Sequence, residues 1–173
     1  LLFYSLSPTF IAHSRFVTTD LVAAFGFFIA IASLVRSLES PDFKRQALCG
    51  VVLGIALLFK FSLVLLIPFY VLVYFIWGFL NRENTPLFYG WLKGLANLLV
   101  IFTLAVLVIA AVYQFHIWNY PVERQIYDTE FNLSSFGFRP AADFTVFLVK
   151  TPALRGLGQY LLGLFMVVQR AAG

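Results

Sequence analysis

The chain has 173 residues, of which 61% are hydrophobic, 18% are aromatic and only 12% are charged, whereas soluble domains carry about 25% charged residues. Its net charge of +4 is spread along the sequence without a block of lysine or arginine, so we expect no binding to nucleic acid. The apolar residues form runs near bilayer length, which excludes an ordinary soluble domain and predicts an all-α, polytopic transmembrane helical bundle. Because the chain begins Leu-Leu-Phe without a methionine, we expect it to be an internal piece of a longer protein.

The first complete span is predicted over residues 20–36. Asp20 falls in the first turn of this helix, where a carboxylate complements the positive end of the helix dipole. One interpretation of Asp20 is therefore that its carboxylate stabilises the start of this helix. Cys49, the one cysteine of the chain, lies inside the next apolar run and is expected to be a small, buried residue that packs between helices.

That next apolar run, over residues 47–79, is interrupted by a lysine. As one helix it would be about 50 Å long, well beyond the roughly 30 Å hydrocarbon core. We therefore divide it at Lys60 into spans near residues 46–60 and 61–79. The first of these is short, so Lys60 is expected slightly inside the bilayer or in a cavity lined by protein.

A polar connection with two aromatic anchors is predicted over residues 80–93, followed by a span over residues 95–115. Residues 116–155 carry turn residues and charges but no apolar run long enough to cross, so we expect an extracytoplasmic loop that its aromatic residues keep partly ordered. The final stretch, GLGQYLLGLFMVVQR, predicts an interfacial, amphipathic helix. The expected organisation is a transmembrane region over residues 1–115 and a loop with a juxtamembrane helix over residues 116–173.

The distribution of lysine and arginine predicts the orientation. The connections after the first and third spans hold five basic residues: Arg36, Lys44, Arg45, Arg82 and Lys93. The opposite side holds Arg15 and Lys60. The positive-inside rule places the five in the cytoplasm, so Arg15, Lys60 and the long loop share the extracytoplasmic face. A single tilted span or a re-entrant pair over residues 47–79 would instead reverse the side of the long loop.

On this topology four ionisable residues converge on one membrane face: His13, Arg15, Asp20 and Lys60. Ionisable groups near the apolar layer indicate function by default. The planar fork of Arg15 and the compact ammonium of Lys60 together suit a phosphate or pyrophosphate. In the alternative interpretation, Arg15 pairs with Asp20 and Lys60 merely extends to the head groups. His13 has no partner at ligand spacing, so a hydrogen-bonded loop residue is favoured over a metal ligand or base.

Three carboxylates gather in the segment YPVERQIYDTEF of the long loop: Glu123, Asp128 and Glu130. Carboxylates serve as general bases or metal ligands, but spacing in an unpatterned loop favours a solvated surface. We therefore assign no metal site and no certain cofactor, and a divalent metal ion is the one option left open.

Two stretches, SPTFIAHSRFVTTDLVAAFGFFIA and LCGVVLGIALLFKFSLVLLIP, resemble the core of the GT-C superfamily of polytopic membrane glycosyltransferases. The nearest resemblance is to the bacterial dolichyl-phosphate-mannose–protein mannosyltransferase branch that includes the aminoarabinose transferases. The shared pattern is S-R-x-x-x-x-D at the start of a span, followed by G-x-x-x-G-x-A-x-L-x-K-F-S. The resemblance covers residues 7–68.

The resemblance implies an enzyme of the bacterial inner (plasma) membrane that transfers a sugar from a polyprenyl-phosphate carrier to an extracytoplasmic acceptor, which is a protein, a lipid or a glycan. It places Arg15 and Lys60 near the carrier phosphate and favours a positioning or helix-starting role for Asp20. Together with His13, these are the candidate substrate-binding residues. The catalytic carboxylate of such enzymes lies in the first extracytoplasmic loop, upstream of Ser7. The catalytic residue is therefore expected ahead of this chain, and the piece is expected to be inactive alone.

The rival interpretation is a membrane transporter or a non-catalytic membrane subunit. Charged groups at the ends of spans also line substrate paths, and Pro68 is typical of a broken helix. The sequence shows no internal repeat, and a long aromatic loop on one face suits an acceptor site better. We therefore favour the transferase.

Overall fold

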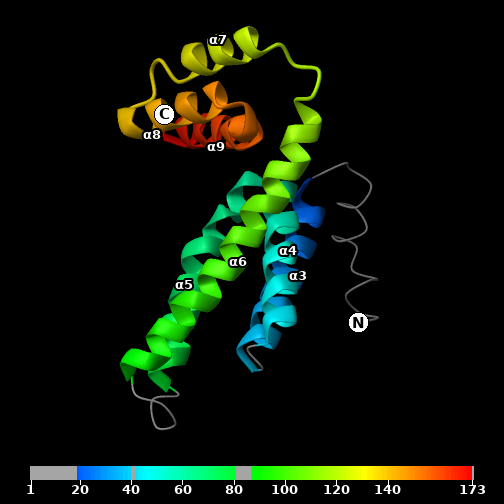
Figure 1. The fold of residues 1–173 in the computed structure, drawn as a ribbon, viewed down its shortest axis with the longest axis vertical. Helices are drawn as coiled ribbons and strands as arrows, with labels where there is room; N and C mark the ends of the chain where they lie inside the picture. The colour runs from blue at the N-terminus through cyan, green and yellow to red at the C-terminus, as the bar shows by residue number, and fades with distance from the viewer. Residues whose placement is uncertain (1–18, 40–41, 81–86, 173) are drawn as a thin grey trace. The chain divides into compact units, whose positions relative to one another are not determined.

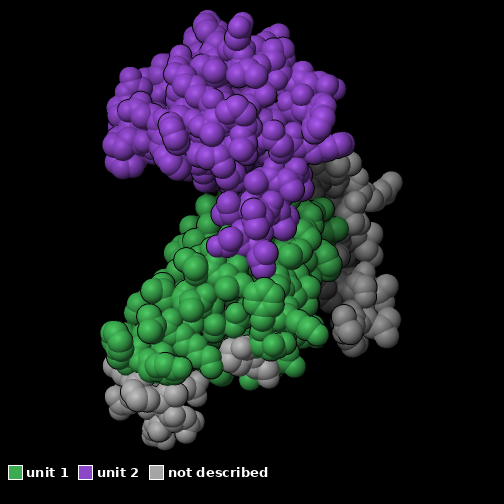
Figure 2. All heavy atoms as spheres, in the orientation of Figure 1, with its two compact units in different colours: residues 1–102 green, residues 103–173 purple. Residues whose placement is uncertain are grey.

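The computed structural model describes residues 19–39, 42–80 and 87–172, and every regular element in these ranges is helical (Figure 1). Three helices in these ranges are long and apolar enough to cross a membrane: Asp20–Glu39, Phe61–Leu80 and Phe88–His116. The all-α membrane bundle expected from composition is thereby confirmed. The chain divides into two compact units, residues 1–102 and 103–173 (Figure 2), which are described separately below.

The first unit is built on the pair α3 (Thr19–Glu39) and α4 (Phe43–Phe59), which lie side by side (Figure 1). Small residues let the two helices approach closely. A Cβ atom at Gly26 would lie only 2.7 Å from Cδ2 of Phe59, and Ala30 is fully buried. Close packing of this kind drives the association of helices in membranes, where lipid is as apolar as the side chains.

The apolar run over residues 47–79 is broken at Lys60, as its length required. Helix α4 ends at Phe59, and Lys60 has extended backbone angles (φ −157°, ψ 134°). A 3-10 turn, η1 (Phe61–Leu65), then leads into α5 (Leu66–Leu80). Pro68 lies in the first turn of α5, directly after the 3-10 turn, a position near a helix start at which proline is tolerated.

Polar side chains connect α3, α4 and α5 inside the core of this unit. The hydroxyl of Tyr70 donates to the backbone oxygen of Ala30 at 2.8 Å, and the hydroxyls of Ser37 and Tyr74 lie 3.2 Å apart. Cys49 is fully buried, with its sulfur 3.8 Å from the Tyr70 hydroxyl. Cys49 is thus the buried packing residue that the sequence predicted. The hydroxyl groups around it form hydrogen bonds within the protein, which the lipid hydrocarbon could not provide.

Helix α6 (Leu87–His116) begins well before residue 95, where the sequence placed the start of this span. The connection expected over residues 80–93 therefore ends in helix, because its aromatic and apolar residues continue the apolar character of the span. Helix α4, with 17 residues, is shorter than the three candidate spans, and its crossing of the membrane stays a prediction.

The second unit contains more helix than expected, because two helices occupy much of the predicted loop over residues 116–155. These are α7 (Val122–Asn132) and α8 (Arg139–Lys150), followed by the 3-10 turn η2 (Pro152–Leu154) and by α9 (Arg155–Ala172). The helices form because each can bury an apolar side in a shared local core. That core consists of Leu133, Ala142 and Leu162, with Phe136, Phe165 and Met166 packed against it.

Two glycines of α9 allow neighbouring backbones to come close. A Cβ atom at Gly156 would lie 2.7 Å from the backbone nitrogen of Gln114. At Gly158 it would lie 2.5 Å from Cγ2 of Val149 and 2.9 Å from the backbone nitrogen of that residue. A side-chain tip could rotate away from such a Cβ atom, but the backbone of Val149 cannot. The close packing of α8 against α9 therefore requires glycine at position 158.

Substitution of Gly158 by alanine should therefore destabilise the second unit. Overpacking costs about 1–3 kcal/mol and alanine returns at most about 1 kcal/mol of helix propensity, so we expect a net loss of about 1–2 kcal/mol. Faster amide hydrogen exchange in α8 and α9 of the membrane-embedded protein would report this loss. Gly137→Ala is the matched control, because nothing lies within 4 Å of a Cβ atom at that position. Equal exchange rates in the two variants would contradict the packing argument.

Candidate functional site

An ion pair joins two of the predicted site residues, although they are far apart in the sequence. The ammonium of Lys60 donates to Oδ1 of Asp20. The side chains are 39% and 71% exposed respectively, so the pair lies where a ligand can reach it. Asp20 and Lys60 thus lie together, on the shared face that their positions in the sequence predicted.

The fold explains this convergence. Helices α3 and α4 pack along each other, and Gly26 near the start of α3 faces Phe59 at the end of α4. Lys60 follows Phe59 directly, and its extended backbone interrupts the helix at that point. The start of α3 and the break after α4 therefore lie at the same end of the helix pair, and this position brings the lysine to the carboxylate.

The chemistry open to this pair is that of a positioned cation. A lysine ammonium carries three donors, of which one serves Asp20, so the others can bind an oxygen of an anionic group. The pair itself contributes little to stability, because both side chains are substantially exposed and water screens such pairs. Arg15 and His13, the other two predicted site residues, lie outside the described residues.

The carboxylates of α7 form local ion pairs and hydrogen bonds. Asp128 accepts a hydrogen bond from the hydroxyl of Tyr120 and lies 3.8 Å from the guanidinium of Arg124. The hydrogen bond to Asp128 raises the pKa of Tyr120. Glu130 accepts from Lys150 at 2.9 Å. In the part of the chain that the structure describes, no three residues among His, Cys, Asp and Glu gather closely enough to hold a metal ion.

A groove of about 490 Å³ runs between α7 and α8. Four charged side chains line it: Glu130, Arg139, Asp143 and Lys150. Arg139 donates to the backbone oxygen of Leu133 at 3.2 Å, which fixes one wall. The groove offers both carboxylates and cations to a polar ligand. Sequence reasoning missed it, because α7 and α8 were expected to be loop.

A buried polar network holds α7 against α9. Gln125 is only 1% exposed, accepts from Nε of Arg155 at 2.9 Å and donates to Oε1 of Gln159 at 2.9 Å. Arg155 also donates to the backbone oxygen of Tyr120 at 2.8 Å. Sequence reasoning missed this network as well. The one signal for it is the i, i+4 spacing of Arg155 and Gln159 on a helix.

A family model for dolichyl-phosphate-mannose-protein mannosyltransferase matches residues 1–107. The chain belongs to this family. No curated protein and no solved structure matches it. At the level of the family, the chain is a membrane glycosyltransferase of the mannosyltransferase type, as the resemblance implied. The match includes Asp20 and Lys60, whereas α7, α8 and α9 lie beyond it.

Proposed function

We propose that this mannosyltransferase-family chain is part of an enzyme that transfers a sugar from a polyprenyl-phosphate carrier to a hydroxyl of an extracytoplasmic acceptor, in the bacterial inner membrane. The ion pair of Lys60 and Asp20, within the segment that the family model matches, is the observation that carries this proposal. It supplies a positioned and accessible cation at one end of the apolar helices.

A cation in this position suits the chemistry of such a transfer. The leaving group is a lipid phosphate, and its negative charge grows as the glycosidic bond breaks. Donors already aimed at that phosphate stabilise the transition state without reorganising. We assign this role to Lys60 together with Arg15, and we assign to Asp20 the positioning of the lysine. The carboxylate base that the acceptor hydroxyl needs is expected ahead of Ser7, as the resemblance implies.

For the acceptor we propose the groove between α7 and α8. Its carboxylates and cations can hydrogen-bond a polar peptide or glycan, and the buried contacts of Gln125 hold α7 in place beside α9. This proposal gives the second unit a role in binding rather than in bond cleavage. A lipid acceptor with a polar head group is compatible with the same groove.

The full-length protein in proteoliposomes, supplied with polyprenyl-phosphate mannose and a peptide containing serine and threonine, tests the function. We expect mannose to leave the carrier and to appear on the peptide. In that assay Asp143→Asn should raise the KM for the peptide several-fold and leave the KM for the donor unchanged. Glu123→Gln is the matched control, because Glu123 lies on α7 but does not line the groove. Passage of the intact carrier across the bilayer without sugar release would instead favour the transporter.

A further inference from the structure

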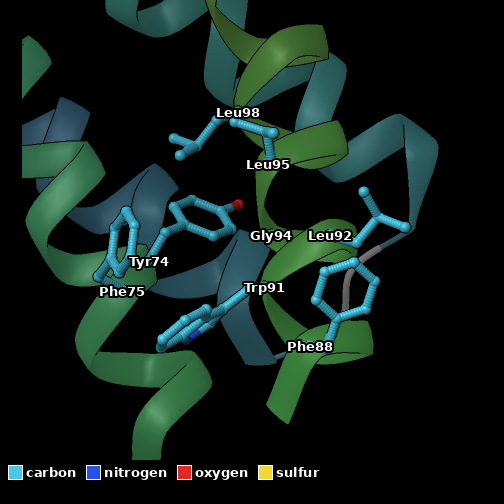
Figure 3. Close-up of a pocket in the computed structure, with 8 residues that line it drawn as sticks. All are labelled: Tyr74, Phe75, Phe88, Trp91, Leu92, Gly94, Leu95 and Leu98. Carbon is cyan, nitrogen blue, oxygen red and sulfur yellow. The ribbon is translucent and has the colours of Figure 1, made fainter. Parts of the chain in front are cut away.

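Two adjoining hollows lie in the first unit, between α5 and α6. The first, of about 220 Å³, is lined by the eight residues labelled in Figure 3, all of them apolar or aromatic apart from one glycine. The second, of about 180 Å³, is more polar and reaches the last turns of α3 at Ser37. Tyr74 and Gly94 line both hollows, so an apolar part and a polar part adjoin at these two residues, as the two parts of one candidate site.

Tyr74 and Gly94 form the wall between the two parts. Figure 3 shows Tyr74 and Phe75 on α5 and Trp91 reaching toward them from α6, and the rings of Phe75 and Trp91 have centroids 5.6 Å apart. A Cβ atom at Gly94 would lie 3.7 Å from Cδ1 of Tyr74, so a larger side chain there would fill the site. The hydroxyl of Tyr74 bonds with Ser37 and is thereby held toward the polar part.

The polar part has the character of an anion site at a membrane surface. Among the described residues that line either hollow, Lys93 alone is charged, and it is joined there by the amide of Asn97. Trp77 and Tyr89 also line this part, and tryptophan and tyrosine favour the head-group level of a bilayer. The site therefore places a cation and aromatic rings of interfacial type beside an apolar hollow.

This site is far from the proposed catalytic end of the helices. Ser37 lies near the end of α3 and Asp20 in its first turn, which separates them by about 25 Å along the helix axis. Because α3 is a candidate membrane span, we expect its two ends at opposite surfaces of the bilayer. A ligand of the site between α5 and α6 is thus distinct from a carrier phosphate bound near Lys60.

We propose that the site between α5 and α6 binds one anionic phospholipid, with its phosphate on Lys93 and Asn97 and an acyl chain in the apolar hollow. An amphiphile matches a polar part that adjoins an apolar part at shared residues. An anionic head group matches a lysine that has no carboxylate beside it among the described residues that line this hollow. The proposal is independent of the transfer reaction and assigns these residues to lipid binding.

Photocrosslinking of the full-length protein in vesicles tests this assignment. The probes are phosphatidylglycerol and phosphatidylcholine, each with a diazirine in one acyl chain and each at the same low mole fraction. Peptide mass spectrometry should find phosphatidylglycerol attached within residues 88–98, and phosphatidylcholine attached there about fivefold less. Lys93→Gln should reduce the phosphatidylglycerol product about fivefold, and Lys93→Arg should retain it. Lys44→Gln is the matched control, because it removes a charge outside both hollows.

Several outcomes would overturn the proposal. Equal labelling by the two lipids would mean that the hollow does not select an anionic head group. Equal loss in the Lys93→Gln and Lys44→Gln variants would mean that any basic residue near the membrane surface attracts the anionic lipid to the same extent. No labelling of this segment by either lipid would mean that another protein segment covers the site. Stronger competition by unlabelled polyprenyl phosphate than by unlabelled phosphatidylglycerol would assign the site to the carrier instead.

Discussion

Replacing Lys60 with methionine in the full-length enzyme should lower turnover on a polyprenyl-phosphate-linked sugar by about tenfold or more, which corresponds to about 1.4 kcal/mol. Methionine keeps much of the apolar stem and removes the ammonium that would face the growing phosphate charge. Loss of one such preorganised donor typically costs about 3 kcal/mol, so tenfold is the lower bound. Turnover by full-length enzyme reconstituted with a saturating acceptor is the measurement.

Two further variants separate phosphate binding from a purely structural ion pair. Arg15→Lys keeps the charge but loses the bidentate fork, and it should also lower turnover about tenfold. If both cations contact one phosphate, the double variant should lose less than the product of the single effects. Asp20→Asn removes the partner of Lys60 but leaves a cation in place, so its loss should be smaller than that of Lys60→Met.

Stability measurements complete this test. The pair of Lys60 and Asp20 is exposed and contributes little to folding, so none of these variants should shift the melting temperature appreciably. Wild-type turnover in both Lys60→Met and Arg15→Lys, with folding intact, would mean that these residues end helices and do not hold a substrate. Equal losses in Lys60→Met and Asp20→Asn would mean that only the ion pair matters.

Substitution of Tyr70 by alanine should lower the free energy of unfolding by about 3–5 kcal/mol, the range measured for large aromatic residues in cores. Tyr70 is fully buried, and its hydroxyl connects α5 to the backbone of α3 at Ala30. Alanine removes the ring and the hydrogen bond together. Unfolding of the protein in bicelles, followed by helical circular dichroism against added denaturing detergent, would measure the loss.

Tyr70→Phe separates the ring from the hydroxyl. This variant should cost only about 0.6–1.5 kcal/mol, the usual range for one hydrogen bond between membrane helices or in a protein core. Phe28→Ala is the control, because Phe28 is 71% exposed and its loss should change stability little. A cost for Tyr70→Ala no larger than that for Phe28→Ala would show that α5 does not pack on α3 through this residue.

Composition and run length were sufficient to predict three apolar helices long enough to cross a membrane and the break at Lys60, because the bilayer limits the length of a helix that crosses it. They did not predict the polar contacts between helices. Ser33 and Ser37 on α3, and Tyr70 and Tyr74 on α5, are each spaced i, i+4 on one face. That spacing indicates a polar face on each of the two helices. It does not indicate that the two faces contact each other, because the choice of neighbouring helix depends on tertiary packing.

The second unit was harder to predict for a different reason. Helices α7 and α8 have only 11 and 12 residues, and helices that short are marginal on their own in water. They form because they share a core with α9, and a single sequence does not show such partners. The convergence of Asp20 and Lys60 was predictable, since both fall at helix ends on one side of the expected topology.

The length of α4 has a consequence for the bilayer itself. Its 17 residues span about 25 Å, less than the roughly 30 Å of hydrocarbon. A helix shorter than the membrane is accommodated by local thinning and by flanking residues that reach for the head groups. Helix α4 ends at Phe59 and Lys60 follows it directly, so in an α4 that crosses the bilayer we expect this mismatch to draw the head-group layer inward at the lysine. A phosphate at the bilayer surface would then reach that ammonium without leaving the polar layer.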